Sequence, residues 1–278
     1  MKIKKAVITA AGLEQKHLPL QTLVSPCGNT KTVAEFLLDE IFASGIETAA
    51  LIIAPGTERA YTTALAEHLE KITFIEQSEP LGYGHAVLVA KDFIGDDRFL
   101  LQMSDHIYLS QTDQSCVQQL LTIAEQTDSS VSTVKPTHES KLPLYGTIAG
   151  SRIASHSGLY EVCNIIEKPT PTLAEQELII PGLRSGHYLC FFGTHVLTPQ
   201  VITHLEQEFE KNPTNLPLTP SLAATAHSES YQACEIDGLR FNMGEPYGLL
   251  RAQLGMALTG ENREDIMSSI IELIAVTK

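Results

Sequence analysis

Short runs of consecutive hydrophobic residues alternate with helical spacing along the first hundred residues. The runs at residues 6–9, 49–54, 72–75 and 99–103 predict buried strands. Between the first two, Val33, Phe36, Leu37 and Ile41 fall on one helical face, and Gly45 stands where that helix would end. Further helices are predicted at 57–68, with Thr57 as the N-cap, and at 86–91. Such alternation indicates βαβ units and a right-handed, mostly parallel sheet.

The second half of the chain is less regular. Strands are predicted at residues 130–134, 146–149, 160–167 and 188–192, and helices at 199–210 and 217–225. Ile266, Ile270, Leu273 and Ile274 indicate an amphipathic helix near the C-terminus. No internal repeat, low-complexity tract or interdomain linker is evident. We therefore expect residues 1–278 to form a single domain, with halves at about 1–110 and 111–260 and a helix at 261–278.

Composition excludes several classes of protein. The 278 residues are 43% hydrophobic, which suits a protein with a substantial core. Lys and Arg total 19 against 33 for Asp and Glu, a formal charge of −14, which argues against nucleic acid or an anionic membrane as partner. The apolar start is too short for a signal peptide, and no stretch is long enough to span a bilayer.

The cysteines indicate thiols rather than disulfides or a zinc site. The sequence has five, and none forms a C-x-x-C pair: Cys27, Cys116, Cys163, Cys190 and Cys234. An odd, scattered set predicts reduced thiols and a cytoplasmic protein.

Polar residues and glycines follow three of the predicted strands. Ligands of parallel sheets bind beyond the carboxyl ends of the strands, so the loops after residues 9, 75 and 103 should share one rim. Gly12 would let backbone N–H groups approach an anion or a base, and Gln77 offers one donor and one acceptor to a pyrimidine. Asp105 is well placed to hold Mg²⁺. Each residue alone could equally be an ordinary turn residue.

Five short motifs in a fixed order change that assessment. They are Ala10-Ala11-Gly12-Leu13, the segment from Gln77 to Ala86, Ser104-Asp105, Tyr145-Gly146 and Glu167-Lys168-Pro169. In this order they resemble the bacterial UTP–glucose-1-phosphate uridylyltransferases and the wider sugar-1-phosphate nucleotidyltransferase family. The resemblance implies a Rossmann-like α/β fold of the GT-A type, with a mixed, mostly parallel central sheet flanked by helices. It also implies that the first half binds the nucleotide and the second half the sugar.

The resemblance assigns roles to individual residues. Catalytic roles fall on Lys16, Asp105 and Lys168, and Mg²⁺ ligation on Asp105 and Asn242. Nucleotide binding falls on Ala10, Ala11, Gly12, Gln77, Pro80, Gly82 and Ser104, and sugar binding on Gly146, Glu167, Lys168 and Gly186. His85 is expected to be a helix-face residue rather than a catalyst.

The sequence departs from the family pattern where phosphates and metal are handled. The usual Gly-Thr-Arg triplet is replaced by Glu14, Gln15 and Lys16, and Lys16 lacks the bidentate fork of arginine. The family's Pro-Lys lysine is missing, with Lys31 as the nearest substitute. Asn242 stands in place of the second metal-binding aspartate, and Asp237 or Glu245 could compensate. An amide oxygen can ligate Mg²⁺ but brings no charge.

The favoured function is therefore a Mg²⁺-dependent transferase that forms a UDP-sugar and pyrophosphate from UTP and a sugar 1-phosphate, with glucose 1-phosphate preferred. One alternative is a non-catalytic relative that binds a nucleotide sugar as a sensor or partner subunit. Another is a different enzyme on this fold that uses another activated nucleotide. Because relatives are often dimers or tetramers, a homo-oligomer is a further expectation.

Overall fold

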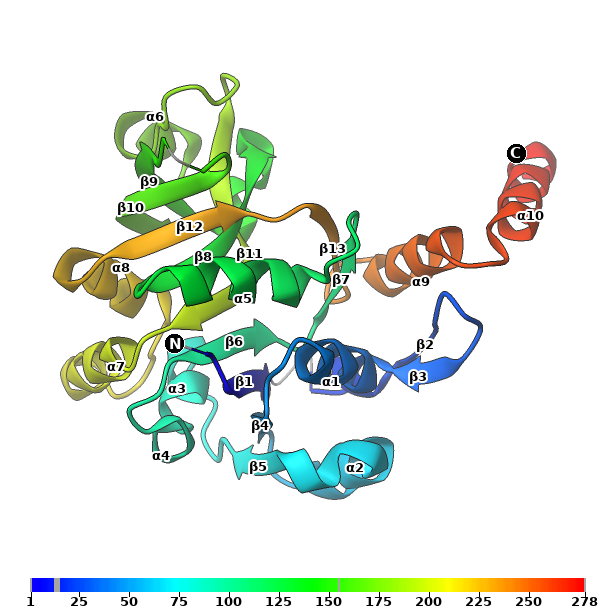
Figure 1. The fold of residues 1–278 in the computed structure, drawn as a ribbon, viewed down its shortest axis with the longest axis horizontal. Coiled ribbons are helices and arrows are strands. Elements are labelled where there is room, and N and C mark those ends of the chain that lie inside the picture. The colour runs from blue at the N-terminus through cyan, green and yellow to red at the C-terminus, as the bar shows by residue number, and fades with distance from the viewer. Residues whose placement is uncertain (1, 13–15, 155, 278) are drawn as a thin grey trace.

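A single large sheet forms the centre of the molecule. The computed structural model describes residues 2–12, 16–154 and 156–277, and within them a nine-stranded sheet runs through both halves of the chain (Figure 1). Its strands, in spatial order, are β5 (Ile72–Glu76), β4 (Thr48–Ile53), β1 (Lys5–Ala10), β6 (Phe99–Met103), β11 (His187–Leu197), β8 (Ser130–His138), β12 (Tyr231–Glu235), β10 (Leu159–Glu167) and β9 (Gly146–Arg152).

Parallel pairing is concentrated in the first half. Strands β5, β4, β1 and β6 are mutually parallel, with Val7 of β1 opposite Ala50 on one side and Leu101 on the other. β11 is antiparallel to both of its neighbours, β6 and β8, and β12 is parallel to β8. β10 pairs antiparallel with β12 and β9. The predicted α/β class with a mixed sheet is confirmed.

Helices cover both faces of the sheet, which explains the continuous hydrophobic runs. Along β1, Ala6 and Ile8 face a core shared with α1 and α5, whereas Val7 faces the opposite core, shared with α3, α7 and α8. The helices are α1 (Val33–Ala43), α2 (Glu58–Ala64), α3 (Tyr83–Leu88), α4 (Lys91–Ile94), α5 (Cys116–Gln126), α6 (Pro171–Glu177), α7 (Gln200–Lys211), α8 (Thr219–Ser228), α9 (Gly248–Thr259) and α10 (Arg263–Val276). Short 3-10 helices are η1 (Leu18–Leu20), η2 (Ala66–Lys71) and η3 (Glu139–Leu144).

The helix predicted at residues 57–68 differs in two details. Thr57 is at the N-cap position, but its hydroxyl donates to the carbonyl oxygen of Ala54 at 2.7 Å instead of accepting from the helix. The α-helix also ends at Ala64, and a 3-10 segment continues the chain to Lys71. The helix predicted at 86–91 begins earlier, at Tyr83, and is followed by the separate α4.

Two small ribbons were not anticipated. β2 (Thr22–Val24) pairs with β3 (Thr30–Thr32), and β7 (His106–Ser110) pairs with β13 (Gly238–Asn242). Both consist of short strands with many polar residues, which give little periodicity. The β7–β13 ribbon matters for function because it places Asn242 opposite His106, next to Asp105.

The predicted C-terminal helix exists as α10. With α9 it extends away from the sheet (Figure 1), and no described residue of α10 is buried. Ile271, Leu273 and Ile274 are therefore exposed to solvent within this single chain. Among the described residues, no helix is both long and apolar enough to cross a membrane.

Candidate active site

A cavity lies beyond the carboxyl ends of β1, β5 and β6. It has a volume of about 470 Å³. All seven residues predicted to bind the nucleotide line it, together with five more: Ala10, Ala11, Gly12, Gln77, Pro80, Gly82, Ser104, and then Thr9, Tyr83, Ala86, Met103, Asp105. The topology of parallel strands therefore brings together segments nearly a hundred residues apart, as the strand-end argument requires.

A second cavity of about 440 Å³ adjoins the first. Three of the predicted sugar-binding residues line it, namely Gly146, Glu167 and Lys168, and so does Asn242. The two cavities share four lining residues, which are Gly82, Tyr83, Met103 and Asp105. A ligand in one cavity could therefore meet a ligand in the other beside Asp105.

The side-chain amide of Gln77 is held in one orientation. Its Nε2 donates to the carbonyl oxygen of Gly82 at 3.2 Å and lies 3.0 Å from Nδ1 of His85. Both N–H groups of the amide are used by these contacts, so the carbonyl oxygen is the atom left for a ligand. Gly82 has φ 109°, and a Cβ there would lie 2.7 Å from the carbonyl oxygen of Leu216. Glycine is therefore required at this turn.

Asp105 is fixed between the two halves of the chain. The Nδ1 of His106 lies 2.6 Å from Oδ1 of Asp105, and both side chains are buried. The backbone N–H of Met243 donates to the carbonyl oxygen of Asp105 at 2.9 Å, which ties this turn to the end of β13. Ser104 donates its hydroxyl to the carbonyl oxygen of Thr9 at 2.6 Å, which ties it to β1.

The donor set suits a metal ion that also binds substrate oxygens. Asp105 offers a carboxylate where the cavities meet, and Mg²⁺ in phosphate-transfer sites needs only one or two carboxylates beside phosphates and water. Asn242 is less available, because its Oδ1 already accepts from the backbone N–H of Gly244 at 2.9 Å. Among the described residues, no group of three or more His, Cys, Asp and Glu side chains could hold a metal.

The end of β10 and the start of α8 arrange the sugar side. Oε2 of Glu167 accepts a hydrogen bond from the hydroxyl of Thr219 at 2.5 Å. Lys168 follows in a left-handed conformation, φ 46°, and its backbone N–H donates to the carbonyl oxygen of Tyr145 at 3.2 Å. A Cβ on Gly146 would lie 2.8 Å from the Phe191 ring and 3.0 Å from Oε2 of Glu167. The glycine thus leaves room for the carboxylate.

The family of this chain follows from a match over most of its length. A family model described as nucleotidyl transferase matches residues 6–250. The chain belongs to the nucleotidyl transferase family. The family resemblance and the fold expected from it are confirmed.

Individual relatives agree along the whole chain. A UTP–glucose-1-phosphate uridylyltransferase of Streptococcus pneumoniae is 28% identical over 98% of this chain and 96% of the relative. One of Bacillus subtilis is 27% identical over 98% of this chain and 97% of the relative. Among solved structures, a UTP-bound UGPase from Acinetobacter baumannii superposes with a TM-score of 0.74 at 22% identity, covering 98% of this chain and 99% of that one. A UDP-glucose pyrophosphorylase complexed with UDP-glucose gives 0.73 at 21%, over 91% and 98%. The structural matches show the fold.

In this nucleotidyl transferase, some predicted residues lie away from the cavities. Lys16 lines neither cavity, and its carbonyl oxygen accepts from the hydroxyl of Tyr61 at 3.1 Å. Gly186 also lines neither, and its carbonyl oxygen accepts from the N–H of Glu139. Leu13, Glu14 and Gln15 lie outside the described residues, so the altered triplet is described only at Lys16.

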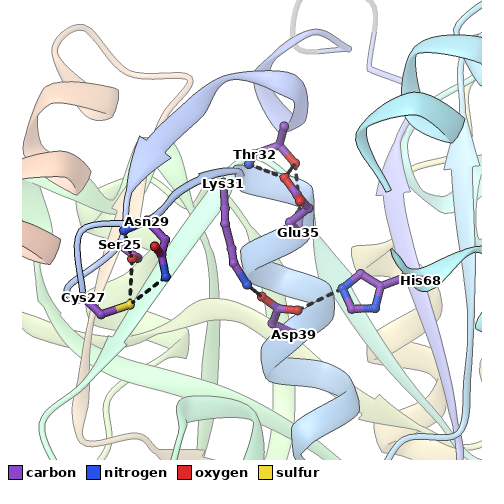
Figure 2. Close-up of polar contacts among 8 residues, drawn as sticks. All are labelled: Ser25, Cys27, Asn29, Lys31, Thr32, Glu35, Asp39 and His68. Carbon is purple, nitrogen blue, oxygen red and sulfur yellow. Dashed lines mark hydrogen bonds and ion pairs between the residues drawn. The ribbon is translucent and has the colours of Figure 1, made fainter. Parts of the chain in front are cut away.

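Lys31 does not take the place of the missing family lysine. Figure 2 shows its ammonium group directed at Asp39 on α1, at 2.6 Å, with His68 2.9 Å from the other oxygen of the same carboxylate. Lys31 lines neither cavity. Glu245 lies nearer to the site, in a small hollow beside Asn242, where Oε2 is 3.8 Å from a guanidinium nitrogen of Arg251. Asp237 lines none of these hollows.

Several residues that line the second cavity belong to none of the sequence motifs. Arg240, Thr219 and His195 line it, and Tyr83 lies where the cavities meet. Burial lowers the pKa of His195 to about 4, so the imidazole is neutral near pH 7. Burial also raises the pKa of Tyr83. Alternation along residues 238–242 could have shown that Arg240 and Asn242 share a strand face, had that strand been recognised.

Proposed function

We propose that this protein transfers a uridylyl group from UTP to glucose 1-phosphate, giving UDP-glucose and pyrophosphate. The observation that carries the proposal is the meeting of two cavities at Asp105, one lined by the predicted nucleotide residues and the other by predicted sugar residues. Full-length relatives named UTP–glucose-1-phosphate uridylyltransferase support the choice of both substrates. The carboxylate of Asp105 at the junction favours a transferase over a sensor, since a protein that only binds a nucleotide sugar would have little need for it.

In the proposed reaction a phosphate oxygen of the sugar 1-phosphate attacks the α-phosphorus of UTP. A new P–O bond forms, and the bond from the α-phosphorus to the bridging oxygen of the β-phosphate breaks, so that pyrophosphate leaves with that electron pair. The protein contributes mainly by orienting the two anions and by offsetting their charge. Two substrates held in adjoining cavities satisfy the first requirement.

Predicted residues from both halves of the chain have roles in this scheme. Gln77 reads the uracil edge through its free carbonyl oxygen, while Ala10, Ala11 and Gly12 accommodate the nucleotide at the end of β1. Glu167 accepts hydrogen bonds from sugar hydroxyls, and Lys168 orients the attacking phosphate. Lys16 supports the triphosphate from the loop after β1. Gly186 contributes its loop to the sugar side.

Magnesium is part of the proposal. Asp105 would hold it together with phosphate oxygens, and Asn242 would contribute only by sharing its amide oxygen with Gly244. When bound, the ion neutralises phosphate charge. We also propose one domain with a nucleotide half and a sugar half, supported by the sheet that runs through both. A cytoplasmic location and a homo-oligomer complete the proposal.

The test is pyrophosphate release from UTP and glucose 1-phosphate in the presence of Mg²⁺. We expect turnover by the wild type and a loss of at least about 100-fold in Asp105→Ala, the order of effect seen when one group that stabilises transition-state charge is removed. Binding of UDP-glucose by both proteins checks that the variant is folded. A wild type that binds UDP-glucose without releasing pyrophosphate would overturn the transferase in favour of a sensor.

A further inference from the structure

We propose that Arg240 is a second cationic residue that positions the phosphate of the sugar 1-phosphate, acting together with Lys168. This inference rests on the proposed function. Arg240 lies on β13 and lines the second cavity, whereas the sequence motifs place only Lys168 on that phosphate.

The guanidinium of Arg240 is held in a fixed position. Its Nη1 donates to the carbonyl oxygen of Phe191 at 2.8 Å. Its central carbon lies 4.2 Å from the ring centroid of Tyr145 and 5.4 Å from that of Phe192. A guanidinium has five N–H donors in a planar fork, so one bond to a carbonyl leaves most of them for a ligand. Stacking on aromatic rings keeps that fork oriented at little further entropic cost.

Tyr145 links Arg240 to Lys168. The ring of Tyr145 stacks on the guanidinium, and its carbonyl oxygen accepts from the backbone N–H of Lys168 at 3.2 Å. Lys168 is the only described non-glycine residue besides Tyr247 with a positive φ, so its backbone is set by local contacts such as this one. One tyrosine therefore contacts both residues, and all three line the second cavity.

The local charges favour an anionic ligand at Arg240. Among the described residues, no carboxylate oxygen lies within 4.0 Å of its guanidinium nitrogens, whereas Glu167 lies 3.9 Å from the Lys168 ammonium and Asp105 contacts His106. Arg240 and Asn242 are two residues apart on one strand and so share a face. A carboxylate at position 242 would compete for the guanidinium, but the neutral amide leaves it available for a phosphate.

The first test compares kinetic constants for the two substrates. In Arg240→Gln we expect KM for glucose 1-phosphate to rise about 10- to 100-fold, the range for losing a hydrogen bond between charged groups, with KM for UTP within about twofold. Arg240→Lys should restore only part of the loss, because an ammonium lacks the fork and stacks less well. A merely structural role would instead change both KM values or the melting temperature.

Arg152→Gln is the matched control. Arg152 also lies over a tyrosine ring, 5.4 Å from the centroid of Tyr160, but lines neither cavity. Both KM values should stay within about twofold in this variant. Equal rises of the two KM values in Arg240→Gln, or an unchanged KM for glucose 1-phosphate, would overturn the assignment.

A binding measurement separates this inference from the proposed function. Calorimetric titration with UDP-glucose and with UMP compares ligands that differ by the second phosphate and the sugar. Arg240→Gln should weaken UDP-glucose about 10- to 100-fold and leave UMP unchanged. This result would stand even if the wild type released no pyrophosphate. An unchanged ratio of the two affinities, or a wild type that does not bind UDP-glucose, would overturn the role of Arg240.

Discussion

The amide nitrogen of Gln77 and the Nδ1 atom of His85 lie 3.0 Å apart, across the turn between β5 and α3. This contact fixes which end of the amide faces the nucleotide cavity. A free carbonyl oxygen can accept from N3–H of uracil, whereas cytosine presents an acceptor at that position and would be repelled. The orientation of one side chain thereby becomes a means of base selection.

We expect His85→Ala to weaken this selection. Without the imidazole the amide of Gln77 can rotate, so the ratio of kcat/KM for UTP to that for CTP should fall roughly fivefold, in line with one hydrogen bond of about 1 kcal/mol. The control is His227→Ala, since its ring contacts the carbonyl oxygen of Ala223 in its own helix and lines neither cavity. An unchanged UTP-to-CTP ratio in His85→Ala would contradict the proposed role of the contact.

Thr219→Val removes the hydroxyl that donates to Glu167. The carboxylate would lose its fixed direction toward the sugar, and KM for glucose 1-phosphate should rise roughly five- to tenfold while KM for UTP stays constant. Steady-state kinetics with each substrate varied in turn measures this. Thr225→Val is the control in the same helix, because its hydroxyl donates to the backbone carbonyl of Ser221 and lines neither cavity. Similar effects of the two valines would mean that helix packing, not Glu167, is responsible.

Gly146→Ala should impair the sugar side by crowding. The new methyl group would press on the Phe191 ring and on Glu167, and such overpacking typically costs 1–3 kcal/mol in stability. We expect a lower melting temperature together with a raised KM for glucose 1-phosphate. Gly45→Ala separates the two effects, since that residue has φ 98° and open space around it, precedes β4 and lines neither cavity. It should lower the melting temperature and leave both KM values unchanged.

His195 should make the protein less stable as the pH is lowered from 7 toward 4. Its folded-state pKa is about 4, against an ordinary value of 6.5, so the unfolded chain binds a proton first as the pH falls. The neutral imidazole therefore adds roughly 3 kcal/mol to the free energy of unfolding at pH 7, at about 1.36 kcal/mol per pH unit. This stabilisation is lost as the pH falls from the unfolded-state pKa to the folded-state pKa. Denaturant unfolding of wild type and His195→Asn at pH 7 and pH 4.5 checks this.

Comparing the wild type with His195→Asn separates the effect of this histidine from that of other titrating groups. Burial raises the pKa of Glu40, which gives stability the opposite dependence on pH, but this carboxyl is present in both proteins. The difference in unfolding free energy between them should therefore change by more than 1 kcal/mol from pH 7 to pH 4.5. A pH-independent difference would show that His195 does not titrate as described.

Sequence patterns located the nucleotide cavity well because its residues follow buried parallel strands. Hydrophobic runs fix where β1, β5 and β6 end, and Ala10, Gln77 and Ser104 come directly after or at those ends. Parallel topology then places the ends together without further information. Glu167 and Lys168 were predicted from their motif, and in the structure both line the second cavity.

The rest of the site depends on contacts that leave no local signal. Arg240 enters through a short ribbon whose two strands are over a hundred residues apart, and Thr219 enters from the first turn of α8. For Lys31 the sequence suggested a role that the structure does not support. Its charge made it a candidate to replace the missing family lysine, but its ammonium group is paired with Asp39 on α1. Contacts between residues far apart in the sequence form only when the chain has folded, so local sequence patterns do not reveal them.

Strand β11 has a consequence for how the molecule can move. Its N-terminal part pairs with β9 on the sugar side, its C-terminal part pairs with β6 on the nucleotide side, and both parts pair with β8. Between them the register shifts at Gly193, where φ is 109° and the Tyr108 hydroxyl occupies the space of a Cβ. A strand shared in this way joins the sheets of the two halves by hydrogen bonds, so we expect the halves to move as one body. Opening and closing must then come from the surrounding loops, and heating should melt both halves in a single cooperative transition.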